Sequence, residues 1–569
     1  MAVIGVICSY IITFARSMRR MILYLLLLVV VPVAAQDKNH NLDVAKNLDV
    51  MNAIYKYLDM MYVDSLDANE VIGNGIDAML TSLDPYTTYY SESDVNKLRT
   101  MITGKYVGVG MLIRWNNEIQ NAVVDEPYEN TPSALAGLKK GDVILSIDGE
   151  SMKGKDTEYV SKHLRGDAGT TFELVFRRPS TGKQMKMKIT RRAIQTPAVP
   201  YYGIQQGNIG YINLNSFMEN SAKEVRRAFI EMKDKGIKGL VFDLRGNGGG
   251  SEQEAVDIVN MFVRKGLLVV SNRGKLKRAS HDYKTTVEPI DTVMPLVVLV
   301  NNGTASASEI TSGALQDFDR AVILGARTYG KGVAQMTMDL PYNGQLKLTT
   351  NKWYTPSGRC IQAITYKHSN GGSTVERADS LAKVFHTAHG REVKDVGGIV
   401  PDIEVKADSM PNIAYYLAVA KDSNEVLLNY ESDYIAKHPT IAPASEFQLS
   451  DADYEEFKQR VLKSGFKYDR ESEKYLKNLK ELAKFEGYYD DAKSDFESLE
   501  KKLSHNVGKD LDYNKRLVKR MMENDIVSAY YFQKGSIQNS LRDDKQMKEA
   551  LKLLGDDARY QQILQPKKK

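Results

Sequence analysis

The spacing of hydrophobic residues changes several times along the chain, and each change marks a different kind of structure. From 36 to 102, apolar residues recur every three or four positions, which predicts a helical N-terminal segment. From 103 to 193, short β-branched and aromatic runs separated by Gly, Pro and Asn-Asn turns predict strands with two short helices. From 194 to 409, strands alternate with amphipathic helices, and from 410 to 569 the chain is polar and helix-rich. These changes predict a multidomain α/β + β protein with a helical C-terminal domain.

The alternation between 205 and 326 is regular enough to predict an α/β layer, in which helices cover a sheet. Strands are expected at NIGYINLNSF, IKGLVFDLRG, MPLVVLV and AVILGA, with a helix after each of the first three. The segment at 368–398 is longer than a turn requires, and we expect it to form an extended hairpin or flap. The helical tail carries no catalytic pattern, so we expect it to serve packing or partner binding.

The N-terminus has the order of a secretory signal peptide. Three arginines precede the apolar run MILYLLLLVVVPV, which ends at the small residues Ala34 and Ala35. Residues 1–35 are therefore expected to be a signal peptide, and the protein to be exported to the periplasm or cell envelope. An uncleaved N-terminal anchor is the alternative. Met18 begins a more ordinary signal sequence than Met1 does.

Composition narrows the class of protein. Apolar residues make up 43% of the 569 residues and charged residues 26%, as in soluble globular proteins. The formal charge of +5 is slight for this length and gives no reason to expect nucleic acid. Cys360 is the one cysteine beyond the leader, so no internal disulfide is expected. Metal-ligand spacing such as HExxH does not occur, so neither a metal nor a cofactor is expected.

The run NNGTASASEITSG, 301–313, follows an apolar strand and leads into a predicted helix. Ser306 and Glu309 fit the capping box S-x-x-E, so one interpretation is a simple helix cap. A serine at a strand-to-helix junction is also well placed as a nucleophile, because the helix N-terminus stabilises negative charge. The next amide, that of Ala307, could donate to an oxyanion.

A base for such a serine is not supplied by histidine, because no histidine stands at a strand end with a supporting acid. A desolvated lysine is another option, because its pKa falls and its neutral amine can accept a proton. GARTYGKGVAQ places Lys331 between two glycines just after the strand AVILGA, and Gln335 could orient the amine. An ordinary surface lysine in a turn is the alternative.

The glycine-rich run DLRGNGGG, 243–250, ends a predicted strand and precedes a helix. Such a loop presents backbone N–H groups, which suits a phosphate or an oxyanion. It lacks a following GK[ST] and does not match GxGxxG, so a nucleotide site is not favoured.

The serine and lysine motifs, with GLVFDLRGNGGG before them, resemble the C-terminal processing peptidases, also called tail-specific proteases. These are serine proteases with a Ser–Lys dyad. The resemblance runs in order from about 40 to 407 and includes LDPYTTYY, YVGVGM, GDVILSIDG and YTPSGRCIQ. It implies that Ser306 is the nucleophile, Lys331 the general base and Gln335 its orienting partner.

By the same resemblance, the oxyanion hole maps to the amide of Ala307 and to a glycine of the GNGGG loop. Gly248 and Gly249 are both candidates, and the sequence does not choose between them.

The resemblance also implies that 103–193 is a PDZ domain. YVGVG would be its carboxylate-binding loop, with DTEYVSKHL as the helix that lines the groove. A PDZ fold that serves only as a spacer or lid is the alternative. The loop residues are Tyr106, Val107, Gly108 and Val109.

These observations predict an exported serine endopeptidase that recognises substrate C-termini through its PDZ domain and cleaves nearby. Its expected partners are proteins or peptides with free C-termini. Membrane-associated or adaptor partners and a homo-oligomer stay open. The alternatives are a catalytically silent PDZ scaffold, a His-Asp-Ser protease with a PDZ domain, and a non-enzymatic ligand binder on the same fold.

Overall fold

The computed structural model describes residues 40–366, 374–376, 379–395, 397–503 and 506–566, so the predicted signal peptide lies outside the described residues. The described residues fall into two compact units, one of residues 40–82 and one that begins at residue 83. The described part of the first unit holds a helix over 40–61 and α2 (Ala68–Thr81), as the apolar spacing predicts. Across the described ranges, no helix is both long enough and apolar enough to cross a membrane.

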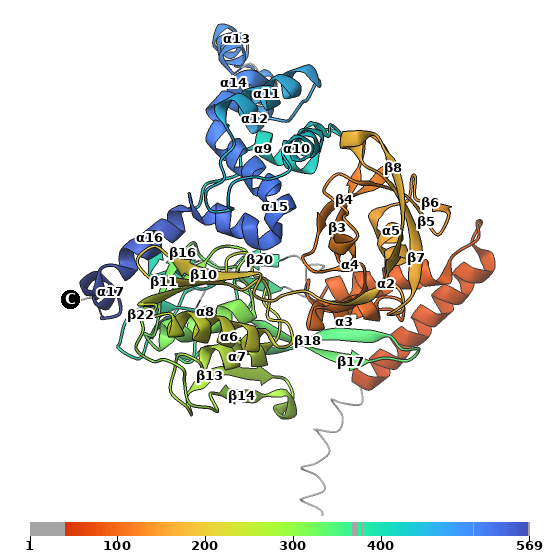
Figure 1. Cartoon of the computed structure of the whole chain (residues 1–569). Coiled ribbons are helices and arrows are strands. Elements are labelled where there is room, and N and C mark those ends of the chain that lie inside the picture. The colour runs from red at the N-terminus through yellow and green to blue at the C-terminus, as the bar shows by residue number, and fades with distance from the viewer. Residues whose placement is uncertain (1–39, 367–373, 377–378, 396, 504–505, 567–569) are drawn as a thin grey trace, which may run out of the picture. The chain divides into compact units, whose positions relative to one another are not determined.

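A six-stranded sheet forms the centre of the second unit (Figure 1). Its strands lie in the order β10, β11, β12, β15, β16, β23, and all pairs except β10 with β11 are parallel. Four of these strands were expected from the sequence. Their bounds are β10 (Tyr201–Gln205), β11 (Ile209–Asn213), β12 (Gly239–Asp243), β15 (Leu296–Val300), β16 (Val322–Gly325) and β23 (Ile403–Glu404).

Helices cover both faces of this sheet. One face packs against α6 (Ser221–Asp234), α7 (Glu252–Val259) and α8 (Ala307–Asp317), in a core rich in Val, Ile, Leu and Phe. The other face packs against α16 (Lys545–Leu554) and α17 (Asp557–Ile563). The last helices of the chain therefore complete the α/β layer, although the sequence places them in the helical tail.

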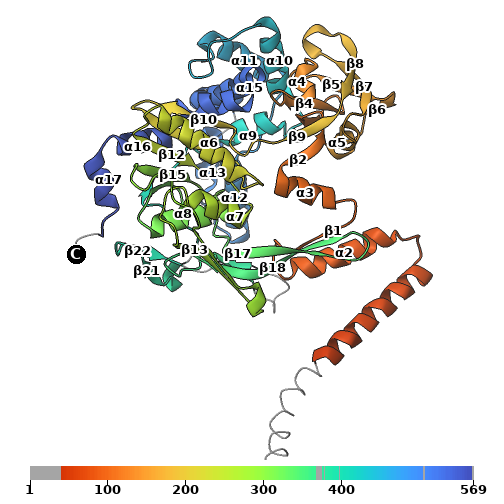
Figure 2. The same ribbon diagram turned by 60° about the horizontal axis from the view of Figure 1, so that its bottom comes forward.

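A second sheet flanks the α/β layer and contains a long β-ribbon (Figure 2). The strand order is β1, β18, β13, β14, with β17 also paired to β18. The short strand β1 lies inside the segment that the sequence reads as helical. The bounds are β1 (Thr88–Tyr90), β13 (Leu268–Gly274), β14 (His281–Lys284), β17 (Val333–Asp339) and β18 (Gln345–Tyr354).

The expected hairpin or flap at 368–398 is described in part. Two small antiparallel pairs occur here, one of β19 (Ile364–Tyr366) with β20 (Thr374–Glu376) and one of β21 (Val384–His386) with β22 (Glu392–Lys394). Two short hairpins therefore take the place of one long one among the described residues.

The β-rich segment is a separate sheet around its own apolar core. Its main strands lie in the order β3, β4, β5, β7, β8, so β3 is an edge strand. It is preceded by α3 (Val95–Thr103). The bounds are β2 (Lys105–Gly108), β3 (Met111–Asn116), β4 (Asn121–Pro127), α4 (Pro132–Leu135), β5 (Val143–Ile147), β6 (Glu150–Ser151), α5 (Thr157–Leu164), β7 (Thr171–Arg177), β8 (Gln184–Thr190) and β9 (Arg192–Gln195).

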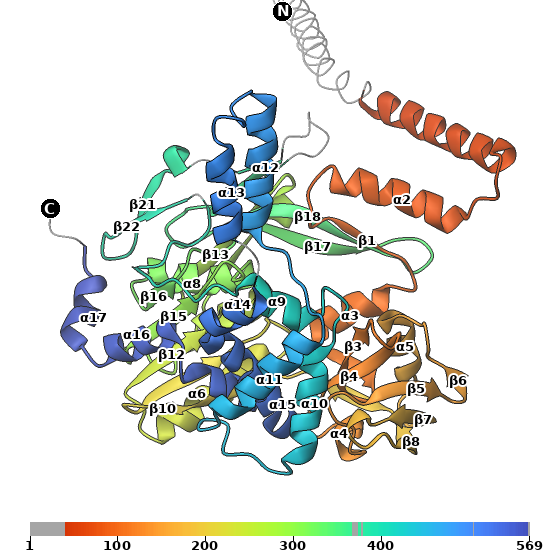
Figure 3. The same ribbon diagram turned by 90° about the horizontal axis from the view of Figure 1, so that it is seen from above.

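The C-terminal region is helical, as predicted, and α12 and α13 form a hairpin (Figure 3). Its longest helix, α15, is interrupted at Phe532, which has a non-helical backbone. The bounds are α9 (Asn412–Val419), α10 (Val426–Lys437), α11 (Asp451–Lys463), α12 (Glu471–Phe485), α13 (Lys493–Lys502), α14 (Val507–Tyr513) and α15 (Lys515–Leu541).

Ion pairs join the helical region to the β-rich domain. Arg114 pairs with Glu425, and Lys140 Nζ lies 3.4 Å from both Asp125 Oδ1 and Glu431 Oε2. A cavity of about 260 Å³ is bordered by Arg114, Lys140 and the two carboxylates beside Lys140. The contact between the two domains therefore combines these charges with a small apolar cluster of Val123, Val143 and Leu428.

Candidate active site

Three loops with chemically interesting residues leave the same edge of the central sheet. β12, β15 and β16 are neighbouring parallel strands, so their carboxyl ends lie side by side. The glycine-rich loop follows β12, Ser306 follows β15, and Lys331 follows β16. The topology thus brings together three motifs that are far apart in the sequence.

Ser306 stands at a sharp turn directly before α8. Its backbone angles, φ 56° and ψ −116°, are unusual for a residue with a side chain. Ser306 and Glu309 form the predicted capping box, but its hydrogen bond runs from the Ser306 N–H to the Glu309 carboxylate, at 2.9 Å. The reciprocal contact, from the Glu309 N–H to the half-buried Ser306 hydroxyl, is only a close approach, because this N–H donates to the Ser306 carbonyl at 2.8 Å.

Two amides beside Ser306 are available to a ligand. Within the described part of the chain, neither the Ala307 N–H nor the Gly248 N–H donates to a protein acceptor. The Gly249 N–H, by contrast, donates to Asn247 Oδ1 at 2.9 Å. The sequence left both glycines open, and this difference favours Gly248 as an oxyanion donor.

Gly249 has a different role, because it lets two loops approach each other. Its φ is +100°, and a Cβ there would lie 2.8 Å from the Ser306 Cβ and 2.9 Å from the Ala307 nitrogen. Asn247 ties the same loops together, since its carbonyl accepts from the Ala305 N–H at 3.0 Å. A glycine at 249 is thus required for the serine turn to sit against the glycine-rich loop.

Glu309 is fully buried and connects the serine turn to the lysine loop. One carboxylate oxygen accepts from the N–H groups of Ser306 and Lys331, each at 2.9 Å. The other accepts from the Gly330 N–H at 2.7 Å and the Thr328 hydroxyl at 2.6 Å. The S-x-x-E pattern pointed to Glu309 only as a helix cap, and its contacts 19 to 22 residues away could not be read from that pattern.

The Lys331 side chain is half-buried, and its backbone carbonyl accepts from the Trp353 indole at 3.0 Å. Burial lowers the pKa of Lys331 to about 8, and the positive charge of Lys347 acts in the same direction. The Lys331 Nζ lies 4.5 Å from the centroid of the Tyr86 ring. Among the residues that the structure describes, no hydrogen bond joins it to the Ser306 Oγ.

Gln335 lies on β17, near the lysine loop. Its amide nitrogen donates to the Thr349 hydroxyl of β18 at 3.0 Å. Its role as a partner of Lys331 stays a prediction, because the amide oxygen is the group that would accept from an ammonium.

Three family models match separate parts of this chain. They are "Peptidase family S41" over 208–368, "PDZ domain" over 123–178 and "Probable PDZ-protease, C-terminal helical domain" over 413–554. A carboxy-terminal-processing protease from Bartonella bacilliformis is 35% identical over 330 residues, which is 57% of this chain and 75% of the relative. The chain belongs to peptidase family S41.

Two further proteins are similar to parts of this chain. A probable CtpA-like serine protease from Staphylococcus aureus is 34% identical over 317 residues, which is 55% of this chain and 62% of the relative. Among solved structures, a photosystem II D1 C-terminal processing protease aligns at 28% identity over 63% of this chain and 86% of that chain, with a TM-score of 0.34. The expected family, the serine-type peptidase class and the PDZ domain are confirmed.

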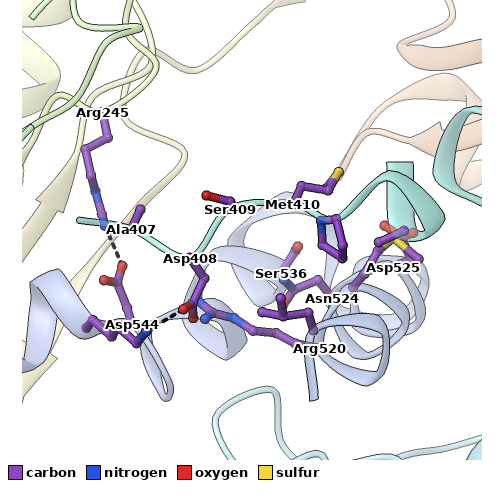
Figure 4. A pocket seen from close by; sticks show the side chains of 15 residues that line it. Arg245, Ala407, Asp408, Ser409, Met410, Arg520, Asn524, Asp525, Ser536 and Asp544 are labelled. Carbon is purple, nitrogen blue, oxygen red and sulfur yellow. Dashed lines mark hydrogen bonds and ion pairs between the residues drawn. The ribbon is translucent and has the colours of Figure 1, made fainter. Parts of the chain in front are cut away.

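In this S41 peptidase, the C-terminal helices reach the glycine-rich loop through Arg245 (Figure 4). Arg245 pairs with Asp243 at the end of β12 and, from Nη1, with Asp544 Oδ2 at 2.6 Å. The same nitrogen donates to Gln546 Oε1 of α16 at 2.9 Å. These contacts border a cavity of about 470 Å³. The loop that carries Gly248 is thus anchored to a helix 301 residues away in sequence, which no local pattern signals.

The PDZ domain of the S41 peptidase presents a loop of the expected kind. β2 ends at Gly108, and over the described stretches the N–H groups of Val109 and Gly110 donate to no protein acceptor. Edge strand β3 and helix α5 follow this loop. The sequence named Tyr106, Val107, Gly108 and Val109 and missed Gly110, although it belongs to the same YVGVG run. Tyr106 contributes its ring instead, which lies under the Arg165 guanidinium at 5.0 Å.

Proposed function

We propose that this chain is an exported serine endopeptidase that binds free substrate C-termini through its PDZ domain and cleaves with Ser306 and Lys331. The observation that carries the proposal is the meeting of three loops at one sheet edge. That edge combines a half-buried serine hydroxyl, a lysine with a lowered pKa, and two amides that donate to no protein acceptor among the described residues.

The reaction begins when the neutral Lys331 amine accepts the Ser306 hydroxyl proton and Oγ attacks the scissile carbonyl. The amides of Ala307 and Gly248 stabilise the oxyanion of the tetrahedral intermediate. Its collapse breaks the C–N bond, and the Lys331 ammonium gives its proton to the leaving amine. Water then attacks the acyl ester with Lys331 again as base, which releases the second product and restores Ser306.

Gln335 is proposed as the partner that orients Lys331 for these transfers. Its amide nitrogen is held by Thr349, so its amide oxygen is left to accept a hydrogen bond from the lysine. Glu309 holds the backbones of both reacting residues in place through its four hydrogen bonds.

Substrate recognition is proposed to use the PDZ loop. The carboxylate of a C-terminus would accept from the N–H groups of Val109 and Gly110, while the peptide pairs with the open edge of β3 beside α5. Export is proposed from the leader at 1–35, and N-terminal sequencing of the mature protein tests it.

The dyad and the PDZ proposal are tested with one peptide in two forms. In one form the peptide ends in an apolar residue with a free carboxylate, and in the other form the carboxylate of that residue is amidated. We expect cleavage of the free form by the unmodified chain, weak cleavage of the amidated form, and none by Ser306→Ala. Undiminished cleavage by Ser306→Ala would overturn the nucleophile, and equal cleavage of both peptides would overturn recognition of the carboxylate. Ser308→Ala is the matched control, because Ser308 is a neighbouring buried serine whose hydroxyl donates to the Asn247 carbonyl.

A further inference from the structure

The side chain of Lys331 is engaged by an aromatic ring rather than by Ser306. The Nζ of Lys331 lies 4.5 Å from the centroid of the Tyr86 ring, within the range of a cation–π interaction. Tyr86 belongs to LDPYTTYY, a run that otherwise has no part in the chemistry described above.

The Tyr86 ring is held in place by a short, well-bonded turn. Asp84 accepts from the N–H groups of Tyr86 and Thr87, at 2.8 and 2.7 Å. Thr87 in turn accepts from the Thr349 N–H of β18 at 3.2 Å, and β1 begins at the next residue. The Tyr86 hydroxyl also lies 3.5 Å from the hydroxyl of Tyr329, two residues before Lys331. The ring is thus fixed to the ribbon and to the lysine loop at once.

We propose that Tyr86 is a positioning residue whose ring holds the Lys331 ammonium apart from Ser306 until the lysine loses its proton. This inference rests on the proposed function of Lys331 as the base. A ring face attracts an ammonium but not a neutral amine, because its quadrupole is negative at the face. Loss of the proton therefore creates the base and releases it from the ring in the same event.

The ring opposes the effect of burial on Lys331. Burial disfavours the ammonium, whereas the ring favours it. Removal of the whole ring would confound the two, because water would enter the space. A test must therefore change the electron density of the ring while its size stays constant. The charged groups that face Lys331 and stay unchanged in such a test are Lys347, Glu309, Asp84 and Glu252.

The experiment uses full-length Ser306→Ala protein with Tyr86→Phe as the reference. Phenylalanine analogues with one, two and three ring fluorines are incorporated at position 86. The readout is the pH dependence of Lys331 acylation by a trace electrophile, measured on the Lys331 peptide by mass spectrometry. We expect the pKa of Lys331 to fall stepwise with fluorination, by about half a unit to one unit over the series.

A second arm places the same analogues at position 329, where the ring does not lie over Lys331, and there the pKa should stay constant. A flat or rising pKa in the position 86 series would overturn the inference. In protein with Ser306 intact, the pH at which kcat/KM reaches half its maximum should follow the same downward series. The acylation readout does not need peptidase activity, and loss of activity in Lys331→Met tests the proposed base separately. The two proposals can therefore fail independently.

Discussion

Two buried lysines in this protein show opposite behaviour. Burial lowers the pKa of Lys331 in the peptidase core to about 8. Lys140 in the PDZ domain has a side chain that is only 8% exposed. Burial alone would lower its pKa as well, but the carboxylates of Glu431, Asp525 and Asp125 together raise it above its ordinary value. Both lysines are therefore buried, and burial alone is not enough to lower the pKa of a lysine so that it can act as a base.

The two lysines differ in how many hydrogen bonds the neighbouring carboxylates already accept from other groups. Glu309 is close to Lys331, but its oxygens accept from three backbone N–H groups and a hydroxyl. Near Lys140, one oxygen of Glu431 and one of Glu126 are buried and have no hydrogen-bond partner within the described part of the structure. A lysine becomes available as a base where the adjacent acid is saturated by other donors, and becomes a fixed ion where it is not.

The comparison is tested most strongly by the same substitution at both lysines. Lys331→Met should lower kcat/KM by at least about 10³-fold, because the base is lost, while the melting temperature stays the same or rises. Lys140→Met should destabilise the protein by about 3–5 kcal/mol, because buried carboxylates lose their cation. Peptide cleavage and thermal melting of both variants measure the two effects. A large loss of stability in Lys331→Met would mean that Lys331 is structural like Lys140.

The next largest effect is expected from two glutamates changed in the same way. Glu309→Gln leaves two N–H or O–H donors facing an amide NH₂, so we expect a loss of about 1–3 kcal/mol and a lower kcat. Glu431→Gln should cost less at pH 7, because burial raises the pKa of Glu431 to about 8 and because Asp125 and Asp525 still face Lys140. Equal losses in the two variants, by denaturant titration, would contradict this contrast.

How far the sequence predicts the site depends on how local each feature is. Ser306 and Lys331 are marked by short patterns at strand ends, and the alternation of strands and helices predicts that these ends meet. The hydrogen bonds of Glu309 to the lysine loop, the ring of Tyr86 and the pairing of Arg245 with Asp544 join distant segments, and no spacing rule encodes them.

The fold shows the same limit. The β11 to β16 alternation follows from apolar runs of the right length, and it was predicted correctly. Helices α16 and α17 have an amphipathic pattern like the rest of the tail, so the sequence could not reveal that they cover the second face of the central sheet. The pattern of an amphipathic helix predicts that its apolar face is buried, but it does not predict which element buries it.

A rise in pH should increase the activity that depends on Lys331 and decrease the stability that depends on the buried carboxyl groups near Lys140. Lys331 must be neutral to act, so kcat/KM should rise about tenfold per unit below its pKa, which is about 8, and level off above it. Burial raises the pKa of Glu126 to about 7 and of Glu431 to about 8. A carboxyl group whose pKa is higher in the folded than in the unfolded protein favours the folded state while it is protonated. This contribution to stability is present at low pH and is lost as the pH rises through these values.

Between pH 6 and 8, the melting temperature should therefore fall while kcat/KM rises. Glu431→Gln should make the melting temperature less dependent on pH. It should leave the rising part of the plot of kcat/KM against pH, called the activity limb below, where it is. A melting temperature that rises over this range, or an activity limb that moves with Glu431→Gln, would show that the two regions are not independent.

The smallest effect is expected from the lysine that faces Lys331. Lys347 lies on β18, and its positive charge lowers the pKa of Lys331. Lys347→Gln removes this repulsion, so the activity limb should move to higher pH by about half a unit or less, since water and salt screen the charge. Lys352 on the same strand is exposed, and Lys352→Gln should leave the limb unchanged. The shift with Lys347→Gln should also shrink in high salt, and a limb that moves to lower pH would mean that Lys347 acts on Lys331 through packing rather than through its charge.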